Sequence, residues 1–86
     1  MAYEIEITDR AERAFKKLDK RTAQRFYTKL KTIANSEDPF QHVKRLTGVA
    51  LFSIRVGDYR AILDIKRESL VILVVRVGHR SDVYVK

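Results

Sequence analysis

Five residues in the second half of the chain have side chains suited to binding and cleaving a phosphodiester. They lie in two short stretches, "IRVGDYR" and "VGHRSDVY", and are Arg55, Arg60, His79, Arg80 and Tyr84. A guanidinium group matches the oxygens of a phosphate, an imidazole exchanges protons near neutral pH, and a tyrosine ring stacks on an unpaired base. If the fold brings the two stretches together, they indicate a nucleic-acid site; the alternative is a solvated tail after the last strand.

The first stretch belongs to a predicted β-hairpin. Its two-residue Gly-Asp loop is typical of a type II′ turn, which pairs Val56 with Tyr59. The same register places Arg55 opposite Arg60. Like charges that face each other across a β-ladder destabilise it unless an anion lies between them. The register therefore favours an anion site, and the alternatives are two arginines extended into solvent or a slipped register.

The hydrophobic pattern predicts a single domain spanning residues 1–86, built from two helices and at least four strands. The predicted elements are a strand at 3–7, a helix capped by Thr8 or Asp9 that ends near Asp19, a second helix with its apolar stripe from Ala23 to Ala34, strands at 52–56, 59–65 and 70–77, and a last short strand or extension at 82–85.

The order β-α-α-β-β-β predicts an α+β fold in which a helix hairpin packs on one face of a mostly antiparallel sheet of four to five strands. The strand at 70–77 is expected at the centre of the sheet, buried on both faces. The face of the sheet away from the helices is expected to present an aliphatic patch of Ile62, Val71, Leu73, Val75 and Val77. Such a patch usually marks an interaction site; the alternative is that the loop at 35–46 closes over it.

The composition favours a polyanionic partner. Eighteen Lys and Arg against eleven Asp and Glu give the 86 residues a net charge of +7, which suits a nucleic acid or an acidic protein; the alternative is a very soluble protein whose lysines face water.

The absence of cysteine excludes disulfides and thiolate chemistry, and two histidines far apart predict no metal site. The longest apolar run is too short to cross a bilayer, and the charged N-terminal segment does not look like a signal peptide. We therefore expect a cytoplasmic protein.

The stretches "GDYRAILDI" and "VVRVGHRSDVY" resemble the RelE toxins of bacterial and archaeal toxin–antitoxin systems, and "MAYEIEITDRAERAFKKLDKRTAQR" and "VKRLTG" match the layout of that family. The resemblance covers essentially the whole chain. It implies a fold like that of microbial RNases and a ribosome-dependent endoribonuclease, or mRNA interferase. Such an enzyme cuts mRNA in the ribosomal A site, inhibits translation, needs no cofactor, and is neutralised by a RelB-like antitoxin.

The resemblance also implies roles for individual residues. Arg60 would clamp the scissile phosphate, Arg80 would act near the leaving oxygen, and Tyr84 would position a base or the 2′-OH. Further RNA contacts are expected from Lys44, Arg45 and Ser53.

The general base is the point at which this chain departs from the family. Ser53 and Arg55 occupy two positions where well-studied members carry lysines, and neither serine nor arginine accepts a proton readily at neutral pH. His79 is the best local replacement, because a histidine ordinarily titrates near pH 6.5. We therefore add Arg55 and His79 to the predicted catalytic residues.

Two other functions stay open. A ParE-like toxin of the same fold group binds DNA gyrase; "GDYR" fits both families, whereas "GHRSDVY" favours RelE. A non-catalytic RNA- or ribosome-binding module would account for the net charge alone, and the missing lysines keep that reading open.

Overall fold

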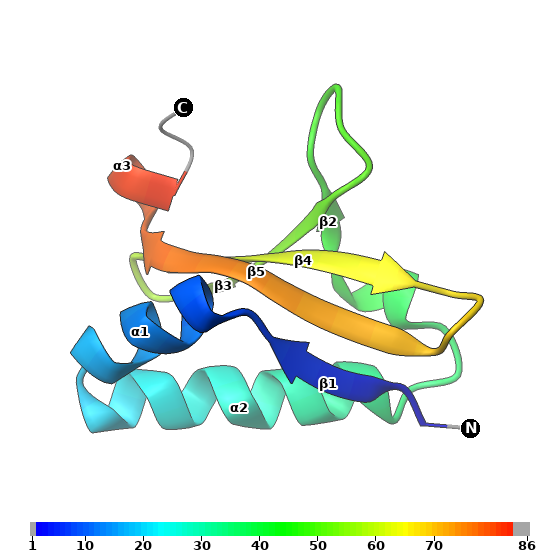
Figure 1. Cartoon of the computed structure of the whole chain (residues 1–86), viewed down its shortest axis with the longest axis horizontal. Helices are drawn as coiled ribbons and strands as arrows, with labels where there is room; N and C mark the ends of the chain where they lie inside the picture. Colours follow the sequence, from blue (N-terminus) through cyan, green and yellow to red (C-terminus); the bar gives the residue numbers. More distant parts are fainter. Residues whose placement is uncertain (1, 84–86) are drawn as a thin grey trace.

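The computed structural model describes residues 2–83, and it contains the predicted α+β arrangement (Figure 1). The elements in chain order are β1 (Glu4–Ile7), α1 (Asp9–Lys17), α2 (Lys20–Ala34), a 3₁₀ turn η1 (Pro39–His42), β2 (Lys44–Arg45), β3 (Phe52–Val56), β4 (Tyr59–Lys66), β5 (Val71–His79) and α3 (Arg80–Val83).

The five strands form one sheet in the order β1-β5-β4-β3-β2. β1 runs parallel to β5, and the other neighbours are antiparallel. α1 and α2 lie together on one face of the sheet, and the β2–β3 connection and α3 rise on the other side, which we call the open face (Figure 1). The sheet therefore has one face covered by helices and one that is available for binding.

Each long helix begins at an N-cap side chain that the sequence places there. The Thr8 hydroxyl accepts a hydrogen bond from the backbone N–H of Ala11 at 3.1 Å, which starts α1. The Asp19 carboxylate accepts one from the backbone N–H of Thr22 at 3.1 Å, which starts α2 where the helical phase breaks. Within residues 2–83, no helix is long and apolar enough to span a membrane.

The core lies between the helix pair and the sheet. α2 contributes Phe26, Leu30 and Ile33, each no more than 1% exposed, which pack with residues of β3, β4 and β5. η1 closes one margin, because the ring of Phe40 meets that of Phe52 edge-on at 5.2 Å. The loop at 35–46 thus packs its apolar side chains against the core on the helix side, and the alternative in which it closes over the open face is wrong.

The β3–β4 hairpin has the predicted register. The pairs are Phe52 with Leu63, Ile54 with Ala61, Arg55 with Arg60 and Val56 with Tyr59. Gly57 has a φ of +59° and Asp58 has no positive φ, as the predicted type II′ turn requires. Arg55 and Arg60 therefore do face each other on adjacent strands.

A β-bulge in β5 overturns part of the predicted face assignment. Ile62 pairs with Arg76, but Leu63 pairs with Val74, so Val75 is an extra residue without a partner in β4. The insertion shifts the alternation of side chains. As a result Val77, predicted on the open face, is 8% exposed and belongs to the core.

The aliphatic patch expected on the open face is consequently smaller than predicted. Ile62 is only 3% exposed, whereas Val71, Leu73 and Val75 are half-buried. β5 lies between β1 and β4, but its residues alternate between buried and half-buried, so it is not buried on both faces as predicted.

The segment after β5 differs from the prediction as well. Residues 80–83 form the short helix α3, so the expected last strand is wrong as far as the structure describes it. β5 runs through Gly78 to His79. A Cβ atom at Gly78 would lie 3.1 Å from Val83 Cγ2. The glycine therefore allows α3 to approach the sheet closely.

The Asp19 cap predicts a specific loss of stability in acid. The hydrogen bonds from the side chain and backbone of Thr22 lower the pKa of the exposed Asp19 carboxyl below its ordinary value of 3.8. A lowered pKa in the folded state means that the charged carboxylate stabilises the fold above pH 3.8, and that this contribution is lost as the pH falls through the lowered value. Asp19→Asn retains an N-cap acceptor but does not titrate. We expect wild type to exceed this variant in melting temperature at pH 5–7 and to converge with it in acid; a difference that persists unchanged at pH 2 would contradict the assignment.

Candidate nucleic-acid interface

Two rows of paired residues bring cationic side chains together at one end of the open face. Residues paired across adjacent strands share a face and lie about 5 Å apart. One row runs through Arg55, Arg60 and Gly78. The neighbouring row runs through Lys44, Ser53, Ile62 and Arg76. Four strands thus supply four cations to a small area of the sheet.

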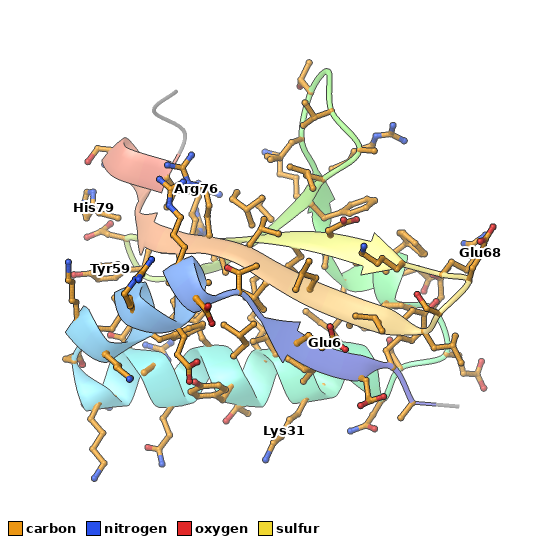
Figure 2. All side chains as sticks on the ribbon, in the orientation of Figure 1. Glu6, Lys31, Tyr59, Glu68, Arg76 and His79 are labelled. Atoms are coloured by element: carbon orange, nitrogen blue, oxygen red, sulfur yellow. The ribbon has the colours of Figure 1, made fainter. Side chains whose placement is uncertain are left out.

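Sequence reasoning missed Arg76. The sequence places it between two valines in a strand, and counting alternate residues from the start of that strand assigns it to the helix side. The bulge at Val75 turns it to the open face, opposite Ile62, and its side chain rises from β5 on the side away from α2 (Figure 2). An arginine that interrupts an apolar strand was the available signal.

A groove continues from these rows over the edge of β3. One depression, of about 350 Å³, is lined by Lys44, Arg45, Leu46, Thr47, Ser53 and Arg60. A second, of about 460 Å³, is lined by Lys29, Gln41, His42, Val43, Lys44, Ser53, Ile54, Arg55 and Arg60. The two share Lys44, Ser53 and Arg60, and no Asp or Glu is among the residues described that line either. We call this combined surface the basic groove.

The predicted RNA-binding residues all line the basic groove. Lys44 and Arg45 come from β2, which the sequence did not predict as a strand. Ser53 is 3% exposed, and its hydroxyl has no hydrogen-bond partner within residues 2–83. Ser53 lines both depressions of the groove.

α2 secures the edge of the groove. The Lys29 ammonium donates a hydrogen bond to the backbone carbonyl of Arg55 at 2.8 Å. β2 pairs with β3 only as far as Ser53, so this contact occupies a carbonyl that β2 leaves uncovered. It also makes α2, through Lys29, one of the elements that supply a cation to the basic groove.

His79 is placed apart from the paired arginines. Its strand partner is Tyr59, whose ring it meets edge-on at 5.8 Å, and Tyr59 packs against the core. His79 Nδ1 accepts a hydrogen bond from the backbone N–H of Ser81 at 3.2 Å and lies 2.8 Å from the Ser81 hydroxyl oxygen. His79 thus caps the start of α3, and its predicted role as general base stays a prediction that this placement does not favour.

Arg80 and Tyr84 follow His79 at the end of the chain. The backbone N–H of Arg80 donates to the carbonyl of Asp58 at 2.9 Å, which anchors the start of α3 to the β3–β4 turn. The exposed Arg80 is therefore beside the turn of the hairpin that carries Arg55 and Arg60. Tyr84 lies outside the described residues.

The other end of the open face has a different charge pattern. Strand pairing places Glu6 beside Leu73 and Asp64, and Glu4 beside Val71 and Lys66. Lys66 Nζ lies 4.0 Å from a carboxylate oxygen of Asp64. Acidic groups thus accompany the cation at this end of the open face, whereas the described lining of the basic groove contains none.

The fold and the basic groove define the class to which the chain belongs. Solved structures with the same architecture include a toxin–antitoxin complex, RelBE2, from Mycobacterium tuberculosis, at 27% identity and a TM-score of 0.80 over 95% of each chain. A mutant of Escherichia coli toxin RelE in the free state is 26% identical, with a TM-score of 0.81 over 98% of this chain and 92% of that one. An archaeal RelE–RelB complex from Pyrococcus horikoshii is 25% identical, with a TM-score of 0.78 over 95% and 99%. The fold is therefore RelE-like.

The sequence comparisons establish the family. Residues 5–84 match the family described as the ParE toxin of type II toxin–antitoxin system, parDE. A RelE-like toxin protein of Escherichia coli is 32% identical over 87 residues, which cover 98% of this chain and 92% of that protein. The chain belongs to the RelE/ParE superfamily of toxins of type II toxin–antitoxin systems, and it is RelE-like.

The facing arginines predict a salt-dependent strain in the free protein. Replacing Arg55 with Thr, a good strand former, removes the like-charge contact with Arg60. We expect the free energy of unfolding at low salt to rise by up to about 1 kcal/mol, and most of this gain to disappear near 1 M NaCl, where charges are screened within about 3 Å. Urea unfolding at both salt concentrations measures it.

Lys66→Thr is the control for this experiment, because Lys66 lies on the same face beside Asp64. It should give no gain at low salt. If Arg55→Thr stabilises the protein equally at low and high salt, the cause is strand propensity and the facing charges are not strained.

Proposed function

We propose that this toxin is a ribosome-dependent mRNA endoribonuclease and that the basic groove holds the phosphodiester that it cuts. The observation that carries the proposal is the cross-strand pair of Arg55 and Arg60, set in a groove whose described lining contains no carboxylate. A cationic surface on a rigid sheet suits a ligand that brings several negative charges. The RelE-like solved structures and the RelE-like relative support the same activity by homology.

The reaction needs only the RNA and positioned side chains. The 2′-oxygen attacks the adjacent phosphorus, the bond from phosphorus to the 5′-oxygen breaks, and the products are a 2′,3′-cyclic phosphate and a 5′-hydroxyl. One proton leaves the 2′-OH and one is delivered to the 5′-oxygen. Fixed guanidinium groups stabilise the negative charge that develops on the phosphoryl oxygens.

We propose that residues on rigid strands perform most of these tasks. Arg60 is half-buried in β4, and we propose that it clamps the scissile phosphate, with Arg55 and Lys44 beside it. The Ser53 hydroxyl would bond a phosphate oxygen or a ribose. Arg80 would serve the leaving 5′-oxygen, and Tyr84 would orient a base, as the family resemblance implies.

The ribosome would supply what the isolated groove lacks. The groove is an open surface on one face of the sheet, so it cannot by itself align the 2′-oxygen, the phosphorus and the 5′-oxygen. Alignment of this kind lowers a barrier strongly, because it converts a random encounter into a fixed geometry. We therefore propose that mRNA is cut in the ribosomal A site, where the decoding machinery holds the strand, and that translation stops as a result.

A second candidate function is inhibition of DNA gyrase. It is favoured by the family description matched over residues 5–84, which is that of a ParE toxin. Direct comparison separates the two functions: the ribonuclease cuts mRNA on programmed ribosomes and leaves gyrase supercoiling unchanged, and a gyrase inhibitor does the reverse.

We also propose that a RelB-like antitoxin neutralises this toxin. Relatives with the same fold were crystallised in complexes with RelB, and the exposed cations of α1 and α2 suit an acidic chain. The half-buried aliphatic residues Val71, Leu73 and Val75 on β5 offer it apolar contacts.

Amide hydrogen exchange tests the antitoxin proposal. Exchange in the helices and along β5 should slow markedly when the toxin is bound to its co-expressed antitoxin, because a bound chain suppresses local opening. Identical exchange in the free and bound toxin would show that these surfaces do not contact the partner.

Arg60→Ala should reduce the rate of mRNA cleavage on programmed ribosomes by about 10²–10³-fold, the usual cost of removing one fixed electrostatic stabiliser. The melting temperature should change little, because Arg60 lies outside the core cluster. Arg13→Ala, which removes the same charge from an exposed position on α1, is the matched control and should cut normally. Wild-type cleavage by a folded Arg60→Ala variant would show that the phosphate is bound elsewhere.

A further inference from the structure

The second depression of the basic groove contains a histidine for which the sequence pattern predicted no role. His42 is the last residue of η1 and is exposed. It lines the depression together with Lys44, Ser53, Arg55 and Arg60. His42 is distant from Arg55 and Arg60 in the sequence. It lies near them in the fold because η1 leads directly into β2, which pairs with the edge of β3.

The charged side chains that share a depression with His42 are all cationic. His42 also lines a neighbouring depression beside α2, which lies outside the basic groove as defined above. The charged side chains that line one or the other of these two depressions are Lys29 and Lys31 from α2, Lys44 from β2, Arg55 from β3 and Arg60 from β4. No carboxylate is among the described residues that line either depression. A ligand that fits here must therefore carry negative charge.

The two histidines of the chain differ in the contacts that their ring nitrogens make. His79 Nδ1 is engaged by Ser81, and its ring lies against Tyr59. His42 has no hydrogen-bond partner within residues 2–83. Both of its ring nitrogens are thus available, and a protonated imidazole offers two N–H donors to phosphate oxygens.

We propose that His42, in its protonated form, is a phosphate-binding residue of the basic groove and makes RNA binding stronger as the pH falls. The ligand is the phosphodiester backbone of single-stranded RNA, and the subsite lies where the groove passes over the edge of β3, next to the phosphate held by Arg60. The inference rests on the proposed function for the identity of the ligand, but not on cleavage.

The physical basis is a linkage between a proton and a phosphate. A histidine ordinarily titrates near pH 6.5, and an anion within a few ångströms favours its charged form. If a bound phosphate shifts the titration midpoint by about one pH unit, the affinity for RNA is about tenfold higher at pH 5.5 than at pH 8. The arginines and lysines of the groove keep their charge over this range, so they contribute no such dependence.

The test is binding of an RNA that cannot be cut, a single-stranded oligonucleotide with 2′-O-methyl riboses, measured by fluorescence anisotropy from pH 5.5 to 8 at constant ionic strength. Wild type and His79→Gln should both show about a tenfold rise in affinity toward low pH. His42→Gln should bind at the weaker, high-pH level throughout. His42→Arg, which keeps a positive charge at every pH, should bind at the stronger level throughout.

A spectroscopic readout locates the effect. The chain has only two histidines, so their ring C–H signals in NMR spectra are assigned by His42→Gln and His79→Gln. Adding the oligonucleotide should raise the titration midpoint of the His42 signal and leave that of His79 unchanged. Circular dichroism of each variant verifies that it is folded.

The inference is overturned if His42→Gln keeps the wild-type pH dependence, if His79→Gln loses it, or if wild type does not bind the oligonucleotide at any pH. Failure of the proposed function looks different. Wild type would then show the His42-dependent binding but would not cut mRNA on programmed ribosomes.

Discussion

The pairing of β4 with β5, with one extra residue in β5, determines which side chains reach which face of this protein. The bulge at Val75 directs Val77 into the core and Arg76 to the open face. It is held from outside the ladder: the backbone N–H of Thr8 donates to the carbonyl of Val74 at 3.0 Å, and the Thr8 hydroxyl lies 3.4 Å from the carbonyl oxygen of Val75. Because Thr8 also caps α1, one residue joins the start of the helix pair to the irregular point of the sheet.

The consequence of this arrangement is a separation of tasks between the two faces. The helix side carries the apolar residues that stabilise the fold, and the open face carries cations that contribute nothing to the core. Like charges on neighbouring strands are unfavourable in the free protein, and they are tolerated because the packing beneath them fixes the strands. An anionic ligand would relieve the repulsion, so in the proposed function the same feature that costs stability would provide affinity for a phosphate.

The same separation bears on how the proposed nuclease would act without the lysines that well-studied RelE toxins carry. Arginine on a rigid strand stabilises charge but does not exchange protons at neutral pH. The structure places one histidine, His42, in the groove and uses the other, His79, to cap α3. In the proposed function, phosphate binding and charge stabilisation would therefore belong to the sheet, whereas the histidine of the groove comes from the turn before β2.

The sequence alone was sufficient for the elements whose signals are local. The cap at Thr8 or Asp9, the break between the helices near Asp19, the helical stripes and the Gly-Asp turn each depend on neighbouring residues, and the register that brings Arg55 opposite Arg60 follows from that turn. The bulge at Val75 was decided by tertiary structure, because it depends on contacts between β5, β4 and a threonine more than sixty residues away. The position of His42 was also decided there, because η1 and β2 form only when Phe40 and the edge of β3 are in place to pack and pair with them. The alternation of apolar and polar residues along one strand does not show where that strand has an extra residue relative to the strand it pairs with. The faces on which Arg76 and Val77 lie could therefore be determined only from the folded protein.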